Sequence, residues 1–264
     1  MLHSYYFSAS NTTEKVVKTV AGNLGMETAH HNLTSAGVAD CMAPAEEDIV
    51  LFAAPVYAGR LPAIAVEKFN KIKGAGQQCI AIVVYGNRHY DDSLLELCDL
   101  LKNNGFNVVA AAAFVAQHCI FPKVATSRPD AADLKKIAGF SSSVRDALAG
   151  GLSLDIDTVY GTRPYKKPAP TPLYPRVDKD KCRECGKCAR ECPSGAISVG
   201  NPRETDAEKC IACSRCIAVC PDKARHFGGL KHSMIAPLFK KMCSKRREPE
   251  WFIAGFTGMQ YPTF

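Results

Sequence analysis

The stretch that decides the fold of the C-terminal part is K-C-R-E-C-G-K-C-A-R-E-C-P, residues 181–193. It returns as K-C-I-A-C-S-R-C-I-A-V-C-P at residues 209–221, so that each cysteine has a counterpart 28 positions later. A fixed offset over a whole motif is an internal repeat. The repeated cysteines are Cys182, Cys185, Cys188 and Cys192, then Cys210, Cys213, Cys216 and Cys220.

The spacing C-x2-C-x2-C-x3-C-P is typical of thiolates that hold a [4Fe–4S] cube. Three thiolates on consecutive short turns bind three irons, and in two-cluster proteins the fourth cysteine binds the other cluster. We therefore predict two clusters, and each draws its fourth ligand from the other half of the repeat. The first ligand set is Cys182, Cys185, Cys188 and Cys220, and the second is Cys210, Cys213, Cys216 and Cys192.

Two other uses of cysteine fit this pattern less well. A structural zinc ion prefers two C-x2-C pairs closed around one ion, whereas this chain has two triplets, each with a further Cys-Pro. A disulfide framework needs a secretory context. The segment instead resembles the bacterial two-[4Fe–4S] ferredoxins.

The length of 264 residues suggests about two domains. The longest apolar run, residues 108–116, is far too short to span a membrane. The start of the chain shows no secretory signal pattern, so we expect a cytoplasmic protein with no membrane span. Five further cysteines have no metal-binding spacing, and we interpret them as buried structural thiols. They are Cys41, Cys79, Cys98, Cys119 and Cys243.

The net charge of +7 is unevenly distributed. Residues 164–264 carry 19 Lys and Arg against 10 Asp and Glu, whereas residues 1–163 carry 14 against 16. A basic face can steer an acidic redox partner protein. No nucleic-acid motif or interleaved aromatic residues accompany it, so we expect no nucleic-acid partner. The sequence leaves the oligomeric state open.

The first 160 residues alternate strand-like and helix-like patterns, which predicts an α/β fold with a parallel sheet. Gly and Pro near the ends of the predicted helices support the assignment. Strands are expected at residues 2–7, 27–33, 49–54, 80–85 and 108–115, and helices at 13–24, 62–73, 92–102 and 131–148.

Three loops at the carboxyl ends of these strands predict a ligand site, since open α/β sheets bind ligands there. Hydroxyls and helix-start N–H groups in residues 7–13 suit a phosphate. An ordinary strand-to-helix turn with a Ser, Thr or Asn cap would show the same residues without any ligand. The other two loops place Gly and Tyr after buried strands, where Gly admits a flat ring and Tyr offers a stacking face. The candidate residues are Ser8, Ser10, Asn11, Thr12 and Thr13; Pro55, Val56, Tyr57, Ala58 and Gly59; and Tyr85, Gly86, Asn87, Arg88, His89 and Tyr90.

The order of a phosphate loop, P-V-Y-A-G-R-x-P and Y-G-N-R-x-Y-D-D resembles the flavodoxin-like domain. The resemblance implies a doubly wound five-stranded parallel sheet of order 2-1-3-4-5, with FMN held by the three loops. The phosphate loop of that family reads S-x-T-G-N-T, and here Ser10 stands at the threonine and Asn11 at the glycine. Among residues other than Gly, Asn best tolerates a left-handed backbone. The turn is therefore expected to form.

The sequence leaves two roles open for several residues near these loops. His89 either tunes the flavin or faces solvent, and Arg60 and Arg88 either counter an anionic flavin or carry ordinary surface charge. Five prolines in residues 164–175 predict a stiff, extended spacer. In the tail, residues 240–250 read as a basic helix that ends at Pro249. Trp251 and Phe252 either dock the tail onto a domain or, as we favour, anchor a solvated charged face.

The whole pattern resembles the anaerobic proteins that fuse a flavodoxin-like domain to a two-[4Fe–4S] ferredoxin domain. The resemblance implies electron transfer through two [4Fe–4S] clusters and FMN. A flavin-dependent reductase fed by the clusters is the alternative, with His89 or Tyr57 as proton donor. No second nucleotide-binding motif is visible, so direct oxidation of NAD(P)H is not expected. The predicted divisions are residues 1–150 for FMN, 151–176 for the linker, 177–230 for the α+β ferredoxin domain and 231–264 for the basic tail.

Overall fold

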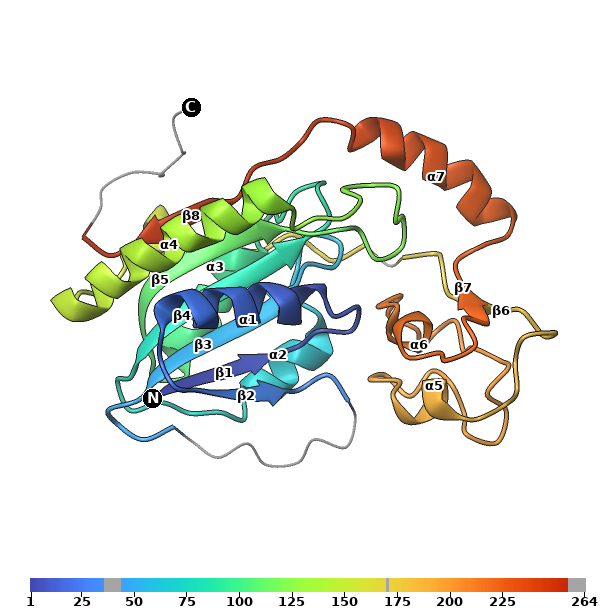
Figure 1. The fold of residues 1–264 in the computed structure, drawn as a ribbon, viewed down its shortest axis with the longest axis horizontal. Helices are drawn as coiled ribbons and strands as arrows, with labels where there is room; N and C mark the ends of the chain where they lie inside the picture. The colour runs from blue at the N-terminus through green and yellow to red at the C-terminus, as the bar shows by residue number, and fades with distance from the viewer. Residues whose placement is uncertain (36–43, 170, 256–264) are drawn as a thin grey trace.

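The N-terminal part of the computed structural model is a single twisted sheet (Figure 1). The structure describes residues 1–35, 44–169 and 171–255. The strand order is β2-β1-β3-β4-β5-β8, the first five strands run parallel, and β8 is antiparallel to β5. The strands are β1 (Leu2–Tyr6), β2 (Thr28–Asn32), β3 (Ile49–Pro55), β4 (Gln78–Tyr85), β5 (Asn107–Val115) and β8 (Glu250–Ile253). The order 2-1-3-4-5 is the flavodoxin-like arrangement, as the sequence predicts.

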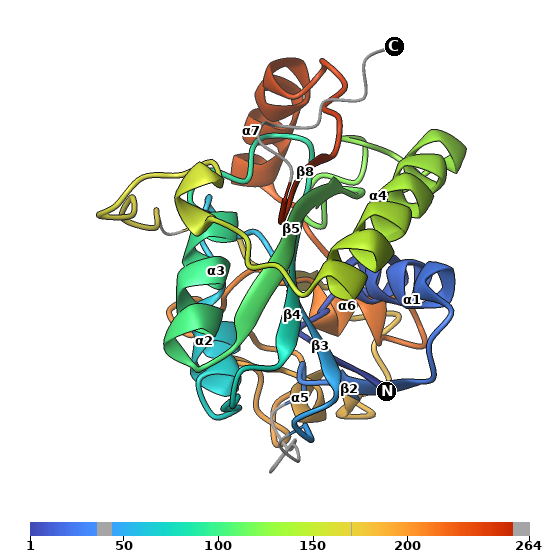
Figure 2. The same ribbon diagram turned by 90° about the vertical axis from the view of Figure 1, so that its left-hand side faces the viewer.

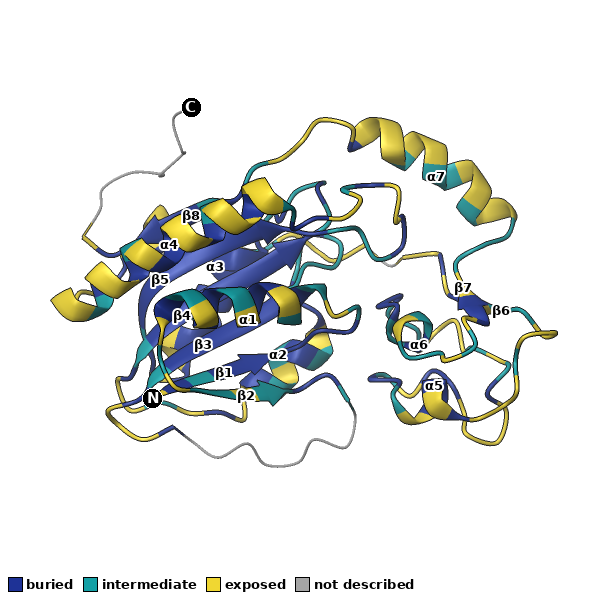
Figure 3. Cartoon of the chain, in the orientation of Figure 1, coloured by how far each residue is buried: buried dark blue, intermediate teal, exposed yellow. Residues whose placement is uncertain are grey.

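Helices cover both faces of this sheet (Figure 2). α1 (Thr12–Leu24) and α4 (Ala131–Gly150) pack on one face, and α2 (Ala63–Phe69) and α3 (Ser93–Asn103) pack on the other. Central strands are therefore buried on both sides, which is why they consist of continuous apolar runs. Figure 3 shows them buried along their length. α2 is shorter than predicted, because Asn70 and Lys71 form a turn and residues 72 and 73 belong to no helix.

β8 is the main departure from the predicted five-stranded sheet. Trp251 and Phe252 pair with Ala112 and Ala111 of β5, and both are buried, on opposite faces of the sheet. The solvated charged face that we favoured for this segment is therefore wrong, and the docked alternative is correct. Four residues are too few to show a clear alternation of polar and apolar residues.

The linker packs along the first domain. Ile156 and Val159, in and beside η1 (Ile156–Thr158), are buried in the core of the face covered by α3. Arg163 pairs with Asp99 of α3 at 2.6 Å. Arg60 also serves this contact, because it binds Glu96 at 2.7 Å and lies 4.8 Å from the Tyr165 ring centroid.

The cysteine repeat forms a small domain with two short helices and one small sheet. These elements are α5 (Lys187–Arg190), α6 (Arg215–Ala218), β6 (Arg176–Val177) and β7 (Arg225–His226), with β6 antiparallel to β7. Figure 1 places this domain beside the carboxyl ends of the parallel strands.

The tail helix begins ten residues earlier than residue 240, where the prediction started it. α7 is Leu230–Met242, and residues 244–249 form no helix. The helix is fixed by its inner side, where Phe239 stacks on Phe121 with ring centroids 4.6 Å apart. Asn87 Nδ2 then donates to the carbonyls of Cys243 and Lys245, each at 2.9 Å, and holds the following segment extended. No helix in the described part of the chain is long and apolar enough to cross a membrane.

Candidate functional site

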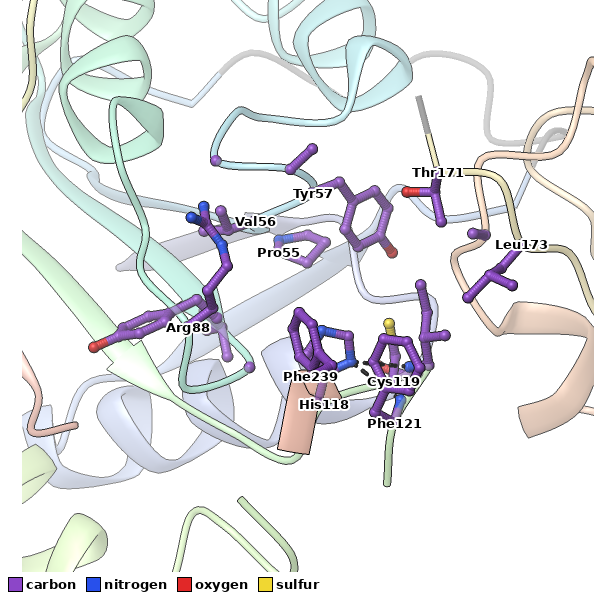
Figure 4. A pocket seen from close by; sticks show the side chains of 18 of the residues that line it. Pro55, Val56, Tyr57, Arg88, His118, Cys119, Phe121, Thr171, Leu173 and Phe239 are labelled. Carbon is purple, nitrogen blue, oxygen red and sulfur yellow. Dashed lines mark hydrogen bonds between the residues drawn. The ribbon is translucent and has the colours of Figure 1, made fainter. Parts of the chain in front are cut away.

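A cavity of about 400 Å³ lies at the carboxyl ends of β1, β3, β4 and β5. The three predicted loops contribute one wall each, and Figure 4 shows Tyr57 and His118 entering the cavity from different segments. The sequence-predicted residues that line it are Ser10, Thr12, Pro55, Val56, Tyr57, Ala58, Gly59, Tyr85, Gly86, Arg88 and His89. A volume of this size is typical of small-molecule and cofactor sites.

The first loop has the backbone expected of a phosphate cradle. Asn11 adopts the left-handed conformation, with φ of 65°, so the predicted turn forms without glycine. Ser10 Oγ and Thr12 Oγ1 lie 3.1 Å apart at the cavity wall. Ser8 does not line the cavity, because its Oγ accepts the backbone N–H of Glu14 at 2.9 Å. Asn11 and Thr13 do not line the cavity, because Asn11 is exposed on the outer side of the loop and Thr13 is buried.

Two residues of the third loop turn away from the cavity. The Asn87 side chain is hydrogen-bonded to the C-terminal segment. Its Nδ2 donates to the Cys243 carbonyl, and its Oδ1 accepts from Arg247 N at 2.9 Å. Tyr90 is fully buried, and its hydroxyl donates to Glu250 at 2.5 Å. Both residues attach the tail to the sheet. Arg88 stays at the cavity wall, paired with Asp91.

More than half of the residues that line the cavity are not predicted from the sequence. One missed segment follows β5 and includes His118, Cys119 and Phe121. The others are Lys166, Ala169, Thr171, Pro172 and Leu173 of the linker, Ile211 and Ala212 of the cysteine repeat, and Ile235 and Phe239 of α7. Cys119 therefore lines the cavity and is only half-buried, whereas Cys79, Cys98 and Cys243 are buried as predicted. Cys41 lies outside the described residues.

Two neutral proton-bearing groups face each other across the cavity (Figure 4). Burial raises the pKa of Tyr57 well above its usual value, so the phenol keeps its proton. Burial, aided by Arg88, lowers the pKa of His118 to about 4. His118 Nδ1 accepts the backbone N–H groups of Ile120 and Phe121 at 3.1 and 3.2 Å. The neutral imidazole therefore carries its proton on Nε2.

Glycine is required at one point of the wall. A Cβ on Gly86 would lie 2.5 Å from the His118 ring, closer than real contacts allow. Gly86 thus lets the β4 loop and the loop after β5 approach each other closely. Any larger residue would push His118 out of its place in the cavity.

The eight repeated cysteines surround two separate small cavities. Cys182, Cys185, Cys188 and Cys220 line one, and Cys192, Cys210, Cys213 and Cys216 line the other. These foursomes are the two ligand sets that the spacing predicts. Among the described residues, no three His, Cys, Asp or Glu side chains meet as the ligands of a single metal ion would. The thiols instead surround an open space, an arrangement that suits a cluster.

Residues 174–221 match a family model described as a 4Fe–4S dicluster domain. The chain therefore joins a domain of flavodoxin-like fold to a segment that matches a 4Fe–4S dicluster domain. No curated protein matches the sequence.

Several solved structures resemble the flavodoxin-like domain at low identity. An archaeal flavodoxin is 12% identical with a TM-score of 0.42, and the match covers 56% of this chain and 99% of that one. A Fusobacterium nucleatum flavodoxin bound to flavin mononucleotide is 14% identical with a TM-score of 0.39, over 55% and 96% of the two chains. An apo NADH:FMN oxidoreductase is 13% identical with a TM-score of 0.42, over 56% and 88%.

The dicluster domain forms part of the cavity wall of the flavodoxin-like domain. Ile211 lines both the large cavity and the cavity surrounded by Cys192, Cys210, Cys213 and Cys216. Cys213 is buried within the apolar core of the flavodoxin-like domain, and Ser214 Oγ donates to the Cys119 carbonyl at 3.0 Å. One residue therefore borders both sites. We call the cavity of Cys213 the inner thiol site and that of Cys185 the outer thiol site.

Proposed function

We propose that this protein transfers electrons between two [4Fe–4S] clusters and FMN. The observation that carries the proposal is the position of Ile211, which lines both the inner thiol site and the large cavity. Electron transfer between cofactors needs them close together with no water-filled gap. Packing of Cys213 into the core of the flavodoxin-like domain supports that arrangement.

The residues of the large cavity fit FMN in kind and in place. Hydroxyls of Ser10 and Thr12 and the free N–H groups at the start of α1 suit its phosphate. Tyr57 offers an aromatic face and Gly86 a close backbone approach for the flat ring. When bound, FMN exchanges electrons singly or in pairs, and each cluster exchanges one.

The outer thiol site is where we expect a redox partner to dock. Cys185 is exposed, whereas three of the four cysteines of the inner site are buried. Exposed cations lie in the same segment of the chain, namely Arg183, which pairs with Asp222, and Lys187 and Arg190. An acidic partner protein would be steered to this surface. The path then runs from the partner through the outer and inner clusters to the flavin, or in reverse, in an anaerobic cytoplasm.

Cofactor content and rapid kinetics of the full-length protein test the proposal. Anaerobic purification should yield about one FMN, eight iron and eight sulfide per chain. Mixing with a reduced acidic ferredoxin should bleach the flavin, and the rate should fall as salt screens the encounter. Full iron with no flavin, even after added FMN, would overturn the flavin part. Intact cofactors that exchange no electrons would overturn the relay.

A flavin-dependent reductase is the second candidate, favoured by Tyr57 and His118, which both bring protons to the cavity. Its electrons would still arrive through the inner thiol site. The two functions differ in what reoxidises the flavin. Turnover of a small electrophile that is lost in Tyr57→Phe, with flavin bleaching unchanged, would establish the reductase. Electron exchange with proteins alone, unaffected by this variant, would establish the carrier.

A further inference from the structure

The phosphate loop of the flavodoxin-like domain lacks a cation of its own. Residues 7–13 contain no Lys or Arg. In the next turn, Lys15 Nζ donates to the Pro129 carbonyl at 3.2 Å, and Lys18 pairs with Glu14 at 2.6 Å. Glu14 itself adds negative charge to the first turn of α1. A phosphate monoester, which carries about −1.5 to −2 charges at pH 7, gains only N–H groups and hydroxyls from this loop.

Arg215 of the dicluster domain reaches this loop from outside. It is the first residue of α6, and its Nη1 lies 3.3 Å from Asn11 Oδ1. Its Nη2 donates to Glu191 at 2.6 Å. Its Nε is buried and has no partner among the described residues. A guanidinium has five N–H donors, so Arg215 keeps unused donors beside the loop.

We propose that Arg215 is the cationic partner of the bound phosphate, so that FMN is held by both domains at once. This inference rests on the proposed function, because it assumes that FMN occupies the large cavity. The same inference explains why Asn11, and not glycine, stands in this turn. The left-handed backbone at φ 65° would suit glycine, but glycine would offer nothing to Arg215. Asn11 is a positioning residue that keeps the guanidinium at the phosphate loop.

Glu191 provides a sharp test, because its charge has the opposite sign. Its carboxylate binds Arg215 and also accepts from Ser35 Oγ of the flavodoxin-like domain at 2.9 Å. If Arg215 and Glu191 only dock the two domains, removing either one should weaken flavin binding alike. If Arg215 acts on the phosphate, removing Glu191 should leave FMN affinity the same or raise it, because more positive charge then remains beside the loop.

The experiment compares FMN with riboflavin, which lacks the phosphate. Full-length protein with intact clusters is stripped of flavin, and dissociation constants are measured from flavin fluorescence quenching. Arg215→Gln should weaken FMN binding roughly 10- to 100-fold, as loss of a charged hydrogen bond does. Riboflavin affinity should change less than about threefold. Arg215→Lys, which keeps the charge, should keep most of the preference for FMN over riboflavin.

Lys187→Gln is the matched control, because Lys187 is the exposed first residue of α5 and the repeat counterpart of Arg215. It should leave both affinities unchanged, and iron content verifies that each variant folds. Equal weakening of FMN and riboflavin in Arg215→Gln, or weaker FMN binding in Glu191→Gln, would overturn the inference. Unchanged FMN affinity in Arg215→Gln would also overturn it and leave the proposed function standing. A wild-type protein that binds neither flavin would overturn both.

Discussion

The two halves of the cysteine repeat have the same backbone and opposite surroundings. Glu184 and Ala212, which are 28 positions apart, both adopt left-handed conformations, with φ of 56° and 53°. Gly186 and Ser214 do the same, at 69° and 67°. Conserved geometry of this kind keeps four thiols around each cavity. The halves differ in the residues between the cysteines.

Those intervening residues decide which half meets the flavodoxin-like domain. The first half carries Arg183 and Glu184, and the second carries Ile211 and Ala212 at the same positions. Charged side chains keep the outer thiol site in solvent. Apolar side chains allow the inner site to pack with Phe121, Leu173 and α7. Cysteine spacing thus sets the ligand geometry, whereas the residues between the cysteines set its orientation in the molecule.

The largest expected effect comes from removing one ligand in each half. Cys185→Ser and Cys213→Ser should each lower iron from about eight to about four per chain. Under limited air, the wild-type protein should lose iron in two phases, because only the outer site is exposed. Cys185→Ser, which retains the inner cluster, should show only the slow phase, and Cys213→Ser, which retains the outer cluster, only the fast phase. Chelatable iron followed over time measures both phases. A single phase in the wild-type protein would break the comparison.

An intermediate effect is expected from exchanging the intervening residues. Ile211→Arg places a charge in the apolar contact between the inner site and the large cavity. The charge should weaken the free energy of FMN binding by roughly 2 kcal/mol, which is about 30-fold in affinity. Arg183→Ile is the matched control, since the exposed Arg183–Asp222 pair, 2.6 Å apart, contributes little. It should change FMN affinity by less than about threefold, and equal losses in both variants would contradict the assignment of the two surfaces.

The smallest effect should be the same in both halves. Asp178 and Asp206 each bind the lysine three residues later and accept nearby backbone N–H groups. A hydrogen bond from the Lys181 side chain lowers the pKa of Asp178, and one from the Lys209 backbone lowers that of Asp206. Folded pKa values below the unfolded value of about 3.9 stabilise the protein above that pH.

This stabilisation should disappear as the pH falls through the lower folded pKa values. Asp178→Asn and Asp206→Asn should therefore lower the melting temperature slightly and equally at pH 7. The difference from wild type should shrink in acid. Thermal unfolding followed by cluster absorbance measures both variants. A larger loss in one half than in the other would show that docking has changed the local structure of the repeat.

Much of this molecule follows from local sequence. The thiol sets follow from spacing and the 28-residue repeat, because short turns fix where neighbouring thiols point. The parallel sheet follows from apolar runs alternating with helical patterns. The left-handed turn at Asn11 follows from the conformational range of asparagine. Each of these features depends on residues that are close along the chain.

The tertiary structure decided what meets at the large cavity. His118 follows a strand like any other loop residue, and no local pattern sets it opposite Tyr57. The linker packs along α3 and so brings the later part of the chain back to the flavodoxin-like domain. Only for this reason does that domain contact Ile211, Phe239 and the short strand β8. Arg215 beside the phosphate loop is the same kind of feature. Contacts between residues more than 100 positions apart depend on the packing of whole elements, which neither spacing nor periodicity encodes.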